Sequence, residues 1–95
     1  MSLLFEWDEV KARENFRKHG VTFDEARTVF GDPFSITISD PQHSRGEYRF
    51  VDLGRSATDE ILIVAYTERK GKIRIINCRK AIKRERRIYE KGIGK

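Results

Sequence analysis

Residues 60–79 have the sequence EILIVAYTERKGKIRIINCR, and this stretch decides the fold. Two runs rich in β-branched residues, 60–68 and 72–79, stand on either side of a short Arg-Lys-Gly turn. Side chains alternate between the two faces of a strand, and a connection this short joins neighbouring antiparallel strands. The stretch therefore predicts a β-hairpin at the centre of an antiparallel sheet.

The second strand of this hairpin is expected to carry both core and functional side chains. Strict alternation places Asn77 and Arg79 on one face together with Ile73 and Ile75. The opposite face is then expected to carry Arg74, Ile76 and Cys78. We therefore expect a sheet with one helix-covered face and one partly open basic face.

Outward from the hairpin, alternating apolar and polar residues predict two more strands, at 34–38 and 47–53. Asp8 and Thr22 predict where helices begin, because each is a capping residue in front of a segment with apolar residues at helical spacing. The predicted helices span 8–18, 22–30 and 81–90. The apolar segment 3–7 is interpreted as a lead into the first helix.

These elements predict an α+β fold in a single domain that spans residues 1–95. We expect two N-terminal helices, a twisted antiparallel sheet of about four strands and a basic C-terminal helix. Ninety-five residues are enough for one core of modest size and too few for two domains.

Charge is divided unevenly along the chain. Residues 69–95 contain twelve Lys or Arg and two Glu, a net charge of +10, whereas the first 68 residues have a net charge of −5. A concentration of cations beside a strand suits a polyanion, because each neutralised phosphate releases counterions. Nucleic acid is therefore the first partner to consider, and a solvated basic helix that serves only solubility is the alternative.

Other classes of protein are not indicated. A single cysteine and the lack of a signal-like apolar N-terminus predict a cytoplasmic location. No membrane association is expected, since no apolar stretch approaches the ~20 residues of a membrane span. His19 and His43 are far apart, and no residues have the spacing of a zinc site or a phosphate-binding glycine loop. We expect no metal and no other cofactor.

Three blocks of sequence carry a family resemblance. They are FEWDEVKARENFRKHGVTFDEARTVFGDP from Phe5, GEYRFVDLG from Gly46 and TERKGKIRIINCRKAIKRERRIYE from Thr67. Together they resemble the BrnT family of type II toxin–antitoxin systems. The resemblance implies a RelE-like fold, a ribonuclease activity that blocks translation and growth, and neutralisation by a DNA-binding antitoxin of the BrnA type. It also implies contact with operator DNA through that antitoxin and a toxin dimer bridged by it.

Metal-independent RNA cleavage needs a base for the 2′-hydroxyl proton, cations for the charge on phosphorus, and an acid for the 5′-oxygen. We expect the scissile phosphate to be held by Arg69, Arg79 and Arg49. We expect proton transfer from Lys18, His19 or Glu47.

Four of these catalytic candidates have a structural alternative. Arg79 could form an ion pair with Glu85, and Arg69 could be a plain turn arginine. Glu47 could form a cross-strand salt bridge, and His19 could serve only to close a helix.

Further RNA contacts are expected from two strands, the basic helix and one aromatic residue. These candidates are Arg49, Arg74, Lys83, Arg84, Arg87 and Tyr89. Tyr89 could stack on a base, although its spacing of seven from Ile82 is also typical of a core residue.

Two other functions remain open from the sequence. A non-catalytic nucleic-acid-binding module would use the same arginines without bringing proton-transfer groups to one phosphate. A degenerate toxin would act only through its antitoxin partner. A shared cleft that gathers the candidates would favour the enzyme.

Overall fold

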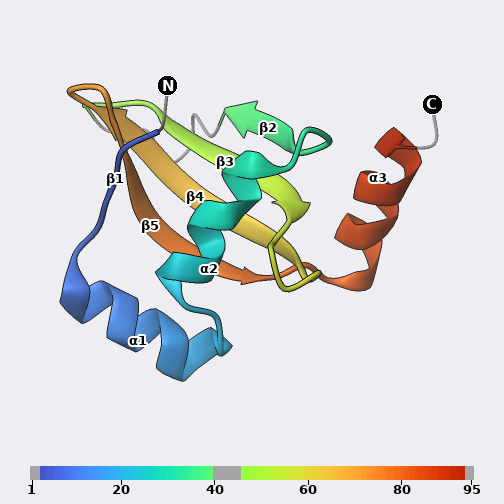
Figure 1. The fold of residues 1–95 in the computed structure, drawn as a ribbon, viewed down its shortest axis with the longest axis horizontal. Coiled ribbons are helices and arrows are strands. Elements are labelled where there is room, and N and C mark those ends of the chain that lie inside the picture. Colours follow the sequence, from blue (N-terminus) through green and yellow to red (C-terminus); the bar gives the residue numbers. More distant parts are fainter. Residues whose placement is uncertain (1–2, 40–45, 94–95) are drawn as a thin grey trace.

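The computed structural model describes residues 3–39 and 46–93, so His43 lies outside the described residues. Its elements form one sheet with helices on both sides (Figure 1). In chain order they are β1 (Phe5–Glu6), α1 (Glu9–His19), α2 (Phe23–Arg27), the 3-10 helix η1 (Thr28–Gly31), β2 (Ile36–Ser39), β3 (Arg49–Arg55), β4 (Ile61–Arg69), β5 (Lys72–Lys80) and α3 (Lys83–Ile93).

The sheet has five strands in the order β1-β5-β4-β3-β2. The predicted hairpin is confirmed as β4 and β5, and β2, β3, β4 and β5 are antiparallel neighbours. The expectation of four antiparallel strands is wrong, because β1 adds a fifth strand that runs parallel to β5. The two residues of β1 are too few to show an alternating pattern in the sequence. This strand forms because it pairs with the edge of β5, where the Ile73 N–H donates a hydrogen bond of 2.8 Å to Leu4 O.

The predicted caps of the N-terminal helices are confirmed. The Asp8 carboxylate accepts hydrogen bonds from the first turn of α1, and Gly20 ends that helix with φ 73°. Thr22 caps α2 through the N–H of Glu25. The second helix was expected to continue to Phe30, but after Arg27 it becomes a 3-10 helix. The last helix begins at Lys83 rather than at the expected Ala81.

A β-bulge interrupts β5 at Ile76. Tyr66 pairs with Ile75 and Ala65 pairs with Asn77, so the pairing skips Ile76. One extra residue reverses which face each later side chain occupies. The prediction from strict alternation is therefore wrong beyond the bulge: Cys78 joins the core, and Asn77 and Arg79 lie on the opposite face.

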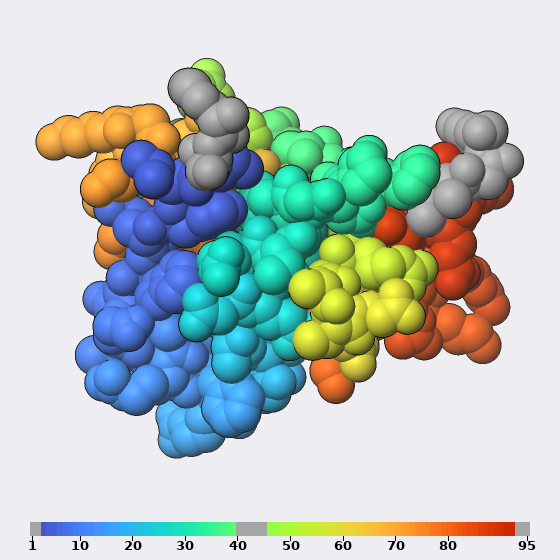
Figure 2. Space-filling model, viewed as in Figure 1, coloured from blue at the N-terminus to red at the C-terminus, as the bar shows by residue number. Residues whose placement is uncertain are grey.

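The core is divided between the two faces of the sheet. The main cluster lies under α1, α2 and η1 and contains Val21, Phe23, Ala26, Val29, Leu62, Val64, Tyr66, Ile73, Ile75 and Cys78. A smaller cluster on the other face contains Leu53, Ile61, Ala81 and Tyr89. This cluster anchors α3 at one end of that face, where the segment 55–60 lies between η1 and α3 in Figure 2. The rest of the second face is the open face of the sheet.

Candidate active site

The predicted catalytic residues fall into two groups at opposite ends of β5. Arg69 pairs in register with Lys72, where β5 begins, and Arg79 pairs with Ile63 near the end of β5. Ile63 and Arg69 are six positions apart on β4, so their Cα atoms are separated by about 20 Å along the strand. The structure therefore separates the two arginines that the sequence analysis assigned to one phosphate.

The first group lines a pocket of about 420 Å³ between α1 and β5, which we call the α1–β5 pocket. Three of the predicted catalytic residues, Lys18, His19 and Arg79, come together here. Its other lining residues are Lys11, Glu14, Asn15, Ile76 and Asn77. The pocket thus combines cations, a carboxylate and an imidazole.

Asn15 holds the two walls of this pocket together. Its buried side-chain amide donates to Cys78 O at 2.9 Å and Val21 O at 3.1 Å, and its oxygen accepts from Cys78 N–H at 3.1 Å. β1 pairs with β5 only as far as Arg74, so Asn15 satisfies backbone groups of β5 beyond the reach of β1. The role of Asn15 was not predicted from the sequence, because it consists mainly of contacts with Cys78, which is far away in the chain.

Cys78 offers no nucleophile to the pocket. Its side chain is fully buried, and this burial raises the pKa of the thiol to about 11, against a smaller opposing effect of the Asn15 hydrogen bond. The thiolate is the reactive form of cysteine, so the protonated thiol is a core group at neutral pH.

Lys18 and His19 reach the pocket because α1 ends there. The last turn of a helix carries partial negative charge and favours cations, and Gly20 in the left-handed conformation turns the chain away immediately afterwards. Imidazole is the side chain that most often transfers protons in enzymes. His19 is half-buried, so it combines access to solvent with a fixed position.

Arg79 meets the pocket as one half of an ion pair, as the alternative interpretation proposed. Its two terminal nitrogens donate to the two oxygens of Glu85 at 2.8 and 2.9 Å. Glu85 also accepts from Ile82 N–H at the start of α3. The hydrogen bonds from Arg79 lower the pKa of Glu85 despite partial desolvation, so the pair stays ionised. An incoming phosphate must compete with Glu85 for this guanidinium.

The second group is an arginine cluster at the hairpin end of β4, formed by Arg49, Arg69 and Arg74. Arg49 on β3 and Arg74 on β5 are both register partners of Thr67, and Arg69 follows two residues later on the same face. The Thr67 side chain is buried beneath this cluster.

Carboxylates partly balance the arginine cluster. Arg69 donates to Glu47 at 3.0 Å, so the predicted salt bridge of Glu47 forms, although Glu47 lies before β3 rather than on a strand. Arg74 lies 3.5 Å from Glu6. The four side chains in these two pairs remain between 30% and 48% exposed. Both pairs are therefore open to solvent and to a ligand.

Residues 7–85 match the family model of the ribonuclease toxin BrnT of type II toxin–antitoxin systems. The chain belongs to this family. The crystal structure of the ribonuclease toxin BrnT from Brucella abortus has the same fold, with a TM-score of 0.63 and 20% identity over 86% of this chain and 100% of that chain. No curated protein matches the chain. The predicted resemblance is thus confirmed, and membership of BrnT implies an antitoxin partner.

The part of the chain that matches BrnT contains both groups of predicted residues and ends at Glu85. Most of α3 lies beyond it. Lys83, Arg84 and Arg87 are exposed on this helix, away from the α1–β5 pocket lining. They add positive charge to the surface of the chain, but they belong to neither of the two groups of predicted catalytic residues.

Tyr89 does not lie where a base could stack on it. The residue is 1% exposed in the smaller core cluster, and its hydroxyl donates to Asp32 at 2.6 Å. Arg55 lies over the ring, 5.6 Å from its centre. The core interpretation is therefore the correct one, and Tyr89 anchors α3. The contact between Tyr89 and Asp32 was not predicted from the sequence.

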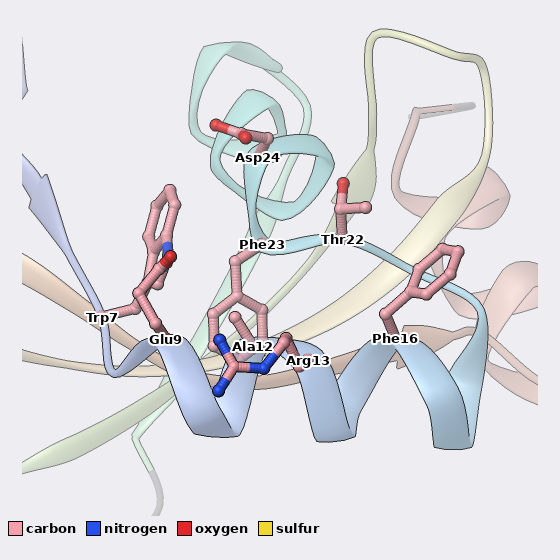
Figure 3. Close-up of a pocket in the computed structure, with 8 residues that line it drawn as sticks. All are labelled: Trp7, Glu9, Ala12, Arg13, Phe16, Thr22, Phe23 and Asp24. Carbon is pink, nitrogen blue, oxygen red and sulfur yellow. The ribbon is translucent and has the colours of Figure 1, made fainter.

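A second hollow lies on the helix-covered side of this BrnT chain, between α1 and α2 (Figure 3). It has a volume of about 480 Å³ and is lined by Trp7, Glu9, Ala12, Arg13, Phe16, Thr22, Phe23 and Asp24. The Trp7 ring N–H donates to Glu9 at 2.8 Å. None of the predicted catalytic or RNA-binding residues lines this hollow.

Metal-binding clusters and membrane-spanning helices are both absent from the part of the chain that the structure describes. Residues 3–39 and 46–93 contain no group of three His, Cys, Asp or Glu that could hold a metal ion. Within the same ranges, no helix is long and apolar enough to cross a membrane.

Proposed function

We propose that this chain is a ribonuclease toxin that cleaves RNA in the α1–β5 pocket without a metal ion. The observation that carries the proposal is that Lys18, His19 and Arg79 line one pocket although they come from distant parts of the chain. Cleavage requires proton transfer and stabilisation of charge on phosphorus, and these three side chains supply both.

The proposed reaction uses the 2′-hydroxyl of the RNA as the nucleophile. His19 takes the hydroxyl proton as the 2′-oxygen attacks phosphorus, and Arg79 stabilises the added negative charge. Lys18 donates a proton to the 5′-oxygen as its bond to phosphorus breaks. The products are a 2′,3′-cyclic phosphate and a 5′-hydroxyl, so atoms and charges balance without a cofactor.

The wider biological role follows from the family as part of the same proposal. Cleavage would block translation and growth in the cytoplasm, and a BrnA-type antitoxin would neutralise the toxin by covering its basic open face. The complex would contact operator DNA through the antitoxin and would contain a toxin dimer bridged by it. The single domain would be RelE-like. The net charge of +10 in residues 69–95 supports a polyanionic substrate and an acidic docking partner.

A cleavage assay with purified protein and single-stranded RNA in a chelator tests the reaction. We expect the wild type to release 2′,3′-cyclic phosphate ends and to leave a 2′-deoxy substrate intact. His19→Gln should lower the rate by about 10²–10⁴, the usual contribution of a proton-transfer group.

Arg27→Ala is the matched control, because Arg27 is an exposed arginine that pairs with Asp24 on α2, outside the pocket. It should cleave as fast as the wild type. Binding of RNA without any cleavage by a folded wild type would instead favour the non-catalytic module.

A further inference from the structure

The bulge at Ile76 aligns polar side chains along one face of β5. Arg74, Asn77 and Arg79 pair with Thr67, Ala65 and Ile63, which are alternate residues of β4 and therefore share a face. Lys72, which pairs with Arg69, begins the same line. We call these four residues, Lys72, Arg74, Asn77 and Arg79, the β5 track. Without the bulge, Asn77 and Arg79 would point into the core.

The two ends of the β5 track differ from its middle. Cations stand at both ends, and Arg79 also lines the α1–β5 pocket. Beside Asn77 the open face presents Ala65 and Val51, which are in register with each other and only partly buried. The middle of the face is therefore a shallow, apolar surface between two positive ends.

The arginine cluster at the far end is suited to an anion. Arg49, Arg69 and Arg74 lie on one face of three neighbouring strands, so this end of the face concentrates positive charge. The ion pairs of Arg69 with Glu47 and of Arg74 with Glu6 are partly open to solvent, and such pairs typically contribute ~0–1 kcal/mol. A phosphate can displace such a carboxylate and accept two parallel bonds from one arginine.

We propose that the chain holds a single-stranded RNA along the β5 track, with a phosphate several nucleotides from the cleaved bond bound at the arginine cluster. The position of the cleaved bond rests on the proposed function. The separation of about 20 Å is within the reach of the ~4–16 nucleotides that small single-strand-binding domains occupy. The backbone would follow the cations, and bases would lie over Val51 and Ala65. Phosphate contacts carry no sequence information, so binding depends on length more than on sequence.

The test is fluorescence anisotropy with uncleavable 2′-O-methyl oligonucleotides of three and nine nucleotides. In the Arg49→Ala, Arg69→Ala variant, we expect the nine-nucleotide probe to bind at least tenfold more weakly and the three-nucleotide probe to bind as before. The slope of log K against log salt should fall by about 1.4, because each contact to a single strand contributes about 0.7.

Two further variants sharpen the result. Arg13→Ala, Arg27→Ala makes the same change in net charge on the helix-covered side and should leave both affinities unchanged. Glu47→Gln removes the carboxylate that competes for Arg69 and should tighten binding of the longer probe severalfold, which a merely structural salt bridge would not do.

An equal loss of affinity for both probes in the Arg49→Ala, Arg69→Ala variant, or no loss for the longer probe, would overturn the proposal. These arginines would then be assigned to binding of a protein partner. Cleavage of unmodified RNA is measured in parallel. A wild type that binds with the expected length dependence but does not cleave would defeat the proposed reaction alone.

Discussion

The two faces of β5 are made from one nine-residue strand, yet they differ in almost every physical respect. One face packs Ile73, Ile75 and Cys78 into the main core beneath α1 and α2. The other presents the β5 track to the open side of the sheet. The single unpaired residue Ile76 separates the two sets, since it restores Cys78 to the core and turns Arg79 outward. Substitutions on the two faces should therefore affect different properties.

The largest effect on stability is expected on the helix-covered face. Ile75→Ala should lower the free energy of unfolding by about 2–5 kcal/mol, because it removes buried methyl groups and leaves a cavity. Asn77→Ala, on the exposed face of the same strand, should change it by no more than about 0.5 kcal/mol. Urea unfolding measures both. Similar losses for the two variants would contradict the division of β5 into a core face and a surface face.

Asn15→Ala should weaken the contact between α1 and the core face of β5. It leaves the N–H and C=O of Cys78 without the amide that satisfies them, and each unsatisfied buried group costs about 1–3 kcal/mol. We expect a loss of about 2–3 kcal/mol in urea unfolding. Arg17→Ala, an exposed position on the same helix, should be nearly neutral. A neutral Asn15→Ala would show that water or a new pairing replaces the amide.

The smaller cluster on the other face holds α3 through an anchor of its own, which is weaker. Tyr89→Phe keeps the buried ring but removes the hydrogen bond to Asp32, and a bond to a charged group contributes about 1.5–3 kcal/mol. We expect a loss near the lower end of that range, with faster amide hydrogen exchange in α3 than in β4 and β5. Ile88→Ala, which truncates an exposed neighbour, is the control. Unchanged exchange in α3 would mean that other contacts hold this helix.

Two aspartates should make the free energy of unfolding depend on pH in opposite directions, and these effects are expected to be the smallest of those considered. Desolvation would raise the pKa of Asp32, but bonds from Tyr89 and from the N–H groups of Arg55 and Phe34 outweigh it and lower the pKa. For Asp52, desolvation outweighs the bonds from Thr37 and Tyr66 and raises the pKa.

The direction of each pH dependence follows from the difference between the folded and unfolded pKa values of the carboxyl group. The unfolded pKa is about 3.9 for both aspartates. The stabilisation from Asp32 is present above pH 4 and is lost as the pH falls through its lowered folded value. The contribution of protonated Asp52 is present below pH 4 and is lost as the pH rises through its raised folded value. At pH 7, Asp32→Asn should therefore destabilise the protein. Asp52→Asn should not, because its amide oxygen can still accept both bonds. Urea unfolding at pH 3.5 and pH 7 measures the difference, and equal responses would contradict these environments.

Local sequence signals predicted the elements well and their partners poorly. Asp8 and Thr22 identified where two helices begin, because capping depends on neighbours within a few residues. The parallel pairing of β1 and the bulge at Ile76 depend on strands far away in sequence, so alternation alone could not reveal them.

The sequence suggested single residues of the candidate site but not how they are grouped. The resemblance and the pattern of cations suggested Lys18, His19 and Arg79 as candidates, the structure places these three around one pocket, and their catalytic roles stay predictions. Arg69 was assigned to the same phosphate although the predicted hairpin already places it at the turn, with Arg79 at the far end of the next strand. Asn15 and Asp32 were missed because their roles consist of contacts with residues more than fifty positions away.

The most direct test of the central claim is induced expression without antitoxin, in which growth and the integrity of total RNA are followed together for the wild type and His19→Gln. We predict growth arrest with fragmented RNA for the wild type. The variant, at an equal level of folded protein, should grow normally with intact RNA. Growth arrest and RNA fragmentation of the same extent in both would contradict a catalytic α1–β5 pocket.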